Sequence, residues 1–108
     1  MGFDKDLVRS MAEPIIMSLV SEWAMYGYEI IKLVNDRTGG SFEWKEGTLY
    51  PCLHRLEAAR LIKSHWEVSD NGRQRKYYGV TRKGADTLTD KLSEWEDFST
   101  AVNSLLPG

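Results

Sequence analysis

The sequence predicts a mainly α-helical fold with one small β-hairpin, and three observations predict it. Apolar residues recur at helical spacing near the start of the chain, in residues 46–62, and from residue 82 towards the end. Between the last two segments stands Asn71-Gly72, flanked by strand-like runs. This dipeptide is the strongest short-range hairpin signal, because its tight turn needs positive φ. A helix followed directly by a hairpin is the plan of a winged helix-turn-helix.

Pro14 interrupts the first helical pattern, which covers residues 3–23. Proline lacks the backbone donor that a helix interior needs, and its ring crowds the preceding turn. We therefore expect two helical segments, about residues 4–12 and 14–23, either separate or continuous with a bend.

A second helix is expected over residues 28–38, after a turn at residues 24–27. Two glycines follow it, and glycine commonly ends a helix just past its C-terminus. A short extended link comes next, in which Phe42 and Trp44 alternate with polar residues. One face of that link is expected to pack on the core.

Residues 46–62 are the segment around which the rest is organised. Their apolar members fall at spacings close to one helix face: Leu49, Leu53, Leu56 and Ile62. The opposite face offers hydroxyls, rings and positive charge to a phosphate or a base edge: Thr48, Tyr50, His54 and Arg55. Pro51 is expected near the helix start, where its missing N–H would be unpaired anyway. Taken alone, this pattern favours an ordinary amphipathic surface helix.

Two strands are expected around the Asn-Gly turn, over residues 61–69 and 75–80. Alternation puts four residues of the first strand on one face: Ile62, Ser64, Trp66 and Val68. The other face holds Lys63, His65 and Glu67. We expect Trp66 and Val68 to cover the body of the protein. The hairpin also carries a basic and aromatic cluster: Arg73, Arg75, Lys76, Tyr77 and Tyr78.

The charges are unevenly distributed along the chain, although the formal net charge is only −2. Residues 1–44 hold four basic and seven acidic side chains, a net of −3. Residues 45–84 hold nine basic and four acidic, a net of +5, and residues 85–108 hold one basic and five acidic, a net of −4. A basic middle is typical of a nucleic-acid footprint that the whole-chain charge conceals. Scattered solvated charge is the alternative, and the segment alone does not decide between them.

Thr81 is placed to cap a last helix over about residues 82–106. A helix of about 25 residues extends about 37 Å, past what a small body can cover. It carries an apolar stripe: Leu88, Leu92, Trp95, Phe98, Val102, Leu105 and Leu106. A second copy of the chain is the simplest partner for this stripe, with the first helix joining the seam. We predict a two-fold homodimer and two domains, a winged helix-turn-helix in residues 1–81 and a dimerisation helix in residues 82–108.

The sequence argues against an enzyme, a metal site and a cofactor. It has no paired-carboxylate, Ser-His-Asp or glycine-rich phosphate constellation, and its two histidines lie on separate elements. Cys52, His54 and His65 are too few and wrongly spaced for structural zinc. Cys52 is the only cysteine, so no internal disulfide forms, and we expect it to be packed.

The chain has neither a membrane-spanning segment nor a signal peptide in its sequence pattern. No apolar run approaches the roughly 20 residues needed to cross a bilayer. The first residues lack the basic and apolar regions of a signal peptide. We therefore expect a cytoplasmic protein without a membrane partner.

Four ordered motifs closely resemble the PadR-like transcriptional regulators. They are Tyr26-Gly27-Tyr28-Glu29-Ile30, Glu46-Gly47-Thr48-Leu49-Tyr50-Pro51, Leu53-His54-Arg55-Leu56-Glu57 and Gly72-Arg73-Gln74-Arg75-Lys76-Tyr77-Tyr78. The resemblance covers nearly the whole chain from about Leu7, and the single C-terminal helix is similar to the compact branch of the family. It implies a bacterial regulator, usually a repressor, that binds two-fold related operator half-sites as a homodimer.

The helix and the hairpin supply the residues expected to bind double-stranded DNA, and the resemblance implies the same roles at these positions. From the central helix we expect Lys45, Gly47, Thr48, Tyr50, His54 and Arg55, where the helix N-terminus also favours a phosphate. From the hairpin we expect Lys63, Arg73, Arg75, Lys76 and Tyr77. Arg73 at the tip is suited to a minor groove and the others to phosphates, with Lys63 the weaker candidate. Tyr26, Tyr28 and Tyr78 are expected in the core or the seam.

Trp95 is the candidate for binding an effector. Some PadR-like proteins sandwich flat aromatic compounds between a pair of tryptophans at the dimer seam, and Trp95 matches that position. Met11 and Ile15 are expected to line the same cleft, which implies a small aromatic effector. Ser99 stands one turn further on, where multidrug-binding members can carry an acid. The alternative is that Trp95 simply fills the seam, because apolar stripes on long helices are usually core.

A winged-helix module that binds protein instead of DNA is the competing hypothesis, which fold alone does not exclude. The charges discriminate between the two. Four basic residues suit a duplex better than an apolar docking surface: Arg55, Arg73, Arg75 and Lys76.

Overall fold

The computed structural model describes residues 2–107; Met1 and Gly108, which the expected domain bounds include, lie outside them. Its elements in chain order are α1 Lys5–Ser10, α2 Ala12–Glu22, β1 Met25–Tyr26, α3 Gly27–Arg37, α4 Glu46–Ala58, β2 Ile62–Val68, β3 Gln74–Val80 and α5 Arg82–Leu105. The predicted fold class, a mainly helical winged helix-turn-helix with a long C-terminal helix, is confirmed.

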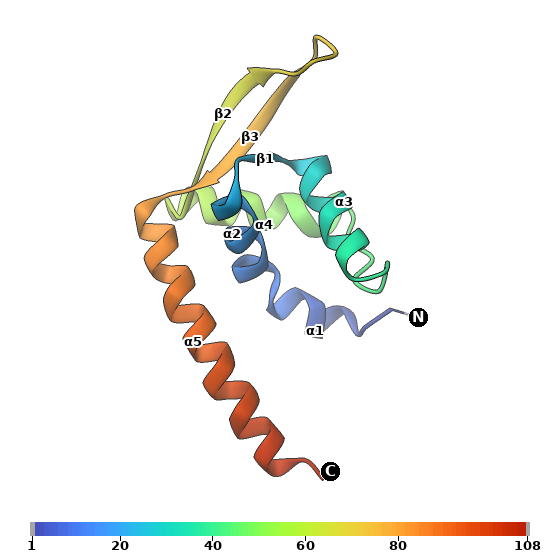
Figure 1. The fold of residues 1–108 in the computed structure, drawn as a ribbon, viewed down its shortest axis with the longest axis vertical. Helices are drawn as coiled ribbons and strands as arrows, with labels where there is room; N and C mark the ends of the chain where they lie inside the picture. The colour runs from blue at the N-terminus through green and yellow to red at the C-terminus, as the bar shows by residue number, and fades with distance from the viewer. Residues whose placement is uncertain (1, 108) are drawn as a thin grey trace.

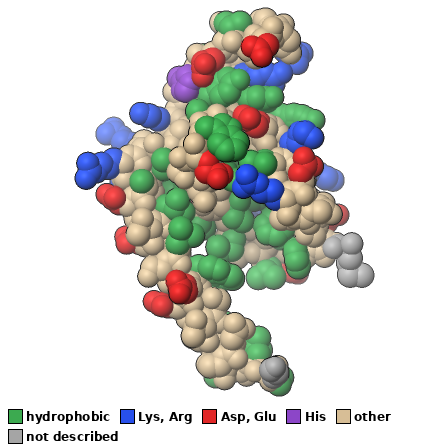
Figure 2. Space-filling view, in the orientation of Figure 1, with side chains coloured by type: hydrophobic (Ala, Val, Ile, Leu, Met, Phe, Trp, Pro, Cys, Tyr) green, Lys and Arg blue, Asp and Glu red, His purple; other side chains and the backbone are tan. Residues whose placement is uncertain are grey.

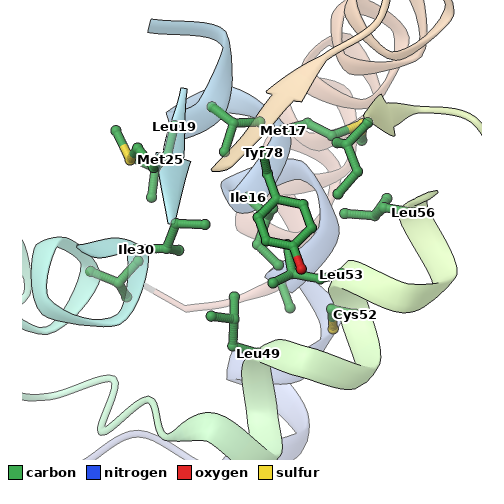
Figure 3. Close-up of a cluster of buried hydrophobic side chains, with 14 of the residues drawn as sticks. Ile16, Met17, Leu19, Met25, Ile30, Leu49, Cys52, Leu53, Leu56 and Tyr78 are labelled. Atoms are coloured by element: carbon green, nitrogen blue, oxygen red, sulfur yellow. The ribbon is translucent and has the colours of Figure 1, made fainter. Parts of the chain in front are cut away.

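One apolar core holds α2, α3 and α4 together. The β2–β3 hairpin projects from one end of this body, and α5 runs away from it in the opposite direction (Figure 1). Tyr78 reaches from β3 into the core, among Ile16 of α2 and Leu53 of α4 (Figure 3). Trp44 is also buried and Phe42 packs against the same cluster, so the link before α4 does face the core.

The sheet has a third strand that the sequence pattern did not predict. Its order is β1-β3-β2, with all neighbours antiparallel. Met25 pairs with Tyr78, at a position where we expected only a turn. This pairing is long-range, and so local pattern does not reveal it. It joins the hairpin to the start of α3.

The first helical region divides at Met11, and not at Pro14 as the sequence suggested. Met11 ends α1 and precedes α2, with backbone angles of φ −107° and ψ 4°. Pro14 is the third residue of α2. The first backbone N–H groups of a helix have no partner within it, and so proline is tolerated there.

Pro51 lies deeper in α4 than the sequence suggested, as the sixth helical residue. At this position the missing N–H would have bonded to the carbonyl of Gly47, four residues earlier. The helix nonetheless continues, because its inner face is buried through Leu49, Cys52, Leu53 and Leu56. Ile62, expected on the same helical face, instead opens β2 and is buried there.

Three aromatic or apolar residues are more exposed than expected. Trp66 and Val68, predicted to cover the body, are 64% and 67% exposed. The reason is that the hairpin extends beyond the body, so only its base packs on the core (Figure 1). Tyr28, expected in the core or the seam, is 58% exposed at the start of α3.

The start of α5 is fastened to the turn that follows α4. The Thr81 hydroxyl caps α5, as predicted, by accepting from the Gly84 backbone N–H at 3.0 Å. The same hydroxyl donates to the Arg60 carbonyl at 2.7 Å, and the Thr81 backbone N–H donates to the Leu61 carbonyl at 3.0 Å. Lys83 Nζ donates to the Ala59 carbonyl at 3.1 Å. These bonds couple the end of α4 to the first turn of α5.

Candidate nucleic-acid interface

The outer face of α4 presents most of the residues predicted to bind DNA. Its buried apolar face fixes the helix against the body, so the remaining face points outward. The exposed members of the predicted set are Lys45, Gly47, Tyr50, His54 and Arg55, with Thr48 half-buried. Lys45 directly precedes the helix, where unpaired N–H groups favour an anion.

Tyr50 packs closely against Gly27, a contact that the sequence pattern does not predict. A Cβ added to Gly27, the first residue of α3, would overlap the Tyr50 hydroxyl and lie 2.8 Å from its Cζ. The Tyr50 ring therefore packs closely over the start of α3. The Tyr26-Gly27-Tyr28 motif was the available signal, but sequence spacing alone does not show that Tyr50 lies against it.

Arg55 lies on the side of α4 that faces α2. Its Nε is 3.4 Å from Glu13 Oε2, and Nη2 donates to Cys52 Sγ at 3.0 Å. Burial raises the pKa of the Cys52 thiol, although the Arg55 charge opposes that shift. The Arg55 side chain remains more than half exposed, so it still offers charge to a ligand near α4.

One face of the sheet carries an ordered array of rings beside Arg75. The Arg75 guanidinium carbon lies 4.3 Å from the centroid of the Tyr26 ring. Tyr77 meets Tyr26 edge-on at 5.4 Å and stacks with His65 at 5.9 Å. Desolvation, followed by the Glu67 charge, raises the pKa of Tyr77.

Lys76 lies on the opposite face of the sheet, between Glu57 and the ring of Tyr78. Its Nζ lies 3.7 Å from Glu57 Oε1 and 5.7 Å from the centroid of the Tyr78 ring. Ser64 also donates to Glu57, which ties the base of the hairpin to α4. Burial raises the pKa of Tyr78, and the neighbouring Glu57 adds to the shift.

The hairpin tip is a defined turn that leaves Arg73 exposed. Gly72 has a φ of +82°, which favours glycine. The Ser69 backbone N–H donates to the Arg73 carbonyl at 2.7 Å, and Asn71 Oδ1 accepts from the Arg73 backbone N–H at 3.1 Å. Lys63 is also exposed, nearer the base of the hairpin. Lysine and arginine side chains accordingly appear around the hairpin in Figure 2.

The ring under Arg75 gives a testable prediction. Changing Tyr26 to Leu is expected to lower affinity for duplex DNA about 2- to 5-fold, because an exposed cation–π contact contributes roughly 0.5–1 kcal/mol. Changing Tyr26 to Phe retains the ring face and is expected to keep affinity within about 2-fold. Titration of a fluorescent duplex measures both. An equal loss in both variants would show that the hydroxyl, and not the ring, supports Arg75.

A second candidate site lies between α1 and α5. An apolar groove of about 320 Å³ is lined by Met11, Ile15 and Trp95, together with Phe3, Leu7, Val8 and Phe42. An adjoining hollow of about 500 Å³ is lined by Trp95 and Phe98 together with charged residues of α1, α2 and α5. Ser99 lines neither; it is half-buried and donates to the Glu96 carbonyl at 3.1 Å. Figure 2 shows hydrophobic side chains in this angle between the helices.

Residues 2–107 contain neither a candidate metal-ion site nor a candidate membrane-spanning helix. No group of three or more His, Cys, Asp or Glu side chains is placed to hold a metal ion there. Among the helices of that range, none is both long enough and apolar enough to span a bilayer.

Comparison with known proteins places this arrangement in a family. A family model described as the transcriptional regulator PadR-like family matches residues 16–90. An uncharacterised protein of Lysinibacillus sphaericus is 36% identical over 104 residues, which cover 95% of this chain and 94% of that protein. A transcriptional regulator of Mycobacterium tuberculosis is 45% identical over 56 residues, which cover 52% of this chain and 51% of that protein.

Solved structures agree with the family match. A transcriptional regulator from Clostridium thermocellum superposes with a TM-score of 0.87 at 33% identity, over 97% of this chain and 99% of that one. A PadR-like regulator from Bacillus cereus gives a TM-score of 0.83 at 33% identity, over 95% and 98% of the two chains. The chain belongs to the PadR-like family of DNA-binding transcriptional regulators.

Proposed function

We propose that this chain is a homodimeric repressor that binds two-fold related operator half-sites and is released by a small aromatic effector. The observation that carries the dimer is the apolar stripe on α5. Four of its large side chains remain exposed in the single chain: Leu92, Trp95, Phe98 and Leu105. Repression is the usual activity implied by the family resemblance.

One part of the stripe is buried within the protomer, and the rest is exposed and available to a partner. Leu88, which we expected in the seam, is only 9% exposed and belongs to the protomer's own core. Towards its C-terminus α5 runs away from the body (Figure 1). Val102 is half-buried and Leu106 is exposed just past the helix. A contiguous apolar patch on a soluble chain favours an interface, and a second copy presents the same stripe.

The two halves of such a dimer place two copies of α4 and the hairpin on one side of a duplex. The proposed contacts from α4 are Lys45, Gly47, Thr48, Tyr50, His54 and Arg55. Those from the hairpin are Lys63, Arg73, Arg75, Lys76 and Tyr77. Two-fold symmetry of the protein then requires two-fold related half-sites in the DNA.

Release by an effector follows from the coupling between α5 and α4. A flat aromatic molecule in the groove at Met11, Ile15 and Trp95 changes how α5 packs against its partner. Because Thr81 and Lys83 bond to the turn after α4, a rotation of α5 carries α4 with it. The spacing between the two recognition helices then changes, and affinity for paired half-sites falls.

Disrupting the stripe tests the dimer. Changing Leu92 and Phe98 together to Glu is expected to give a monomer that binds the operator at least about 100-fold more weakly, because joint binding of two half-sites is lost. Changing exposed Ser93 and Thr100 to Glu adds the same charge to the opposite side of α5 and is expected to leave the dimer intact. Sedimentation and duplex titration measure both properties. A double variant that stays dimeric would contradict the proposed seam.

A further inference from the structure

A cleft that adjoins the outer face of α4 at Tyr50 opens between the hairpin and the starts of α3 and α4. It is a cleft of about 330 Å³ lined by nine residues. Three of them are large aromatic side chains that are exposed: Tyr28, Tyr50 and Trp66. Gln74 and Lys76 line it from β3. None of the nine residues is acidic.

Trp66 is the most informative residue in this cleft. It pairs with Lys76 across the sheet, so both side chains stand on the same face. Val68, the next residue on that face, is equally exposed. Exposing tryptophan to water is unfavourable, and the described chain leaves 64% of the Trp66 surface exposed. The side chain is therefore available to a ligand that enters the cleft.

The occupant is identified by the position of the cleft and its chemistry. In a winged helix one element enters a groove and the hairpin meets the flanking backbone, so the space between them straddles a sugar–phosphate chain. The lining supplies a cation at Lys76, an amide at Gln74 and the hydroxyls of the two exposed tyrosines, Tyr28 and Tyr50. These groups suit phosphate oxygens. The face of the exposed Trp66 ring suits the apolar side of deoxyribose.

We propose that this cleft binds the sugar–phosphate backbone of one DNA strand, with Trp66 packed on deoxyribose and Tyr28 and Lys76 on the adjoining phosphates. This inference rests on the proposed DNA contacts of α4 and the hairpin, and it adds Tyr28, Trp66 and Gln74 to them. In this proposal the uncharged Trp66 side chain contributes affinity but does not contact bases, and so it does not contribute to sequence specificity.

DNA-binding measurements on two variants, Trp66→Ala and Lys76→Ala, test this proposal. Changing Trp66 to Ala is expected to weaken binding about 10-fold, since a large apolar side chain loses its burial. The loss should be equal for operator and unrelated duplexes, because the backbone carries no direct sequence information. The slope of log affinity against log salt should stay unchanged. Changing Lys76 to Ala should instead reduce that slope by about one phosphate contact.

Fluorescence supplies a readout that a purely structural role would not change. Duplex binding should quench tryptophan emission in the unchanged protein, and the Trp66→Phe variant should lose that quenching while retaining most of its affinity. The melting temperature of Trp66→Ala should match that of the unchanged protein, because the side chain is largely exposed.

Two results would overturn the inference. Unchanged affinity in Trp66→Ala, with DNA binding by the unchanged protein intact, would reject the cleft and leave the proposed function standing; the cleft would then be tested for a protein partner. A loss confined to the operator would show that Trp66 contacts bases. If the unchanged protein binds no duplex at low salt, the proposed function itself fails, which is a different outcome.

Discussion

Changing Arg73 and Arg75 together to Ala is expected to lower affinity for duplex DNA on the order of 100-fold at physiological salt. Arg73 stands exposed at a defined turn, and Arg75 is held over the Tyr26 ring. A hydrogen bond to a charged group contributes about 1.5–3 kcal/mol, so two lost phosphate or groove contacts account for this decrease.

The salt dependence of this variant distinguishes lost contacts from misfolding. Each phosphate contact contributes about 0.9 to the slope of log affinity against log salt, and so the slope should fall by up to about 2. A control variant with Arg9 and Lys91 changed to Ala removes the same charge beside Trp95, from a hollow that no residue of the hairpin lines. It should bind DNA like the unchanged protein. An equal loss in both variants would mean that overall charge, and not the hairpin, governs binding.

Changing Gly84 to Ala is expected to destabilise the fold by about 3 kcal/mol. A Cβ at this position would overlap the Leu61 carbonyl oxygen and lie 2.8 Å from Val80 Cγ2. The backbone oxygen cannot rotate away as a side chain does, so α5 must separate from the start of β2. Overpacking of this kind costs about 1–3 kcal/mol, and weakening the Thr81–Leu61 hydrogen bond adds about 1 kcal/mol.

Gly47→Ala is the matched control for this change. Gly47 is also helical, but an added Cβ there meets no atom within 4 Å. Alanine in an open helical position is expected to stabilise by about 0.5–1 kcal/mol. Thermal unfolding at one fixed protein concentration should therefore shift in opposite directions for the two variants. Equal melting temperatures would show that α5 does not pack against Leu61 as described.

The sequence predicted the elements whose signals are local. Asn71-Gly72 marks the hairpin turn, Thr81 caps α5, and the apolar spacing of Leu49, Leu53 and Leu56 gives the buried face of α4. Subdividing the charge also located the basic segment that the whole-chain value of −2 hides. Each of these signals depends only on residues that are close together in the sequence.

What the sequence did not predict depends on contacts between distant residues. Pairing of Met25 with Tyr78 creates β1, and the close approach of Gly27 and Tyr50 joins α3 to α4. Alternation in β2 correctly grouped Trp66 with Val68 but did not show that the hairpin extends beyond the body. Strand period assigns a face, whereas the surrounding fold decides whether that face is covered.

The most direct test of the central proposal is binding of the purified protein to DNA from around its own gene, at about 50 and about 200 mM salt, with the mass of the complex measured. We predict two chains per site, a preference for one duplex sequence over unrelated DNA, and an affinity that falls steeply between the two salt concentrations. A dimer that prefers no duplex even at the lower salt concentration would contradict the proposal and favour a protein-docking module.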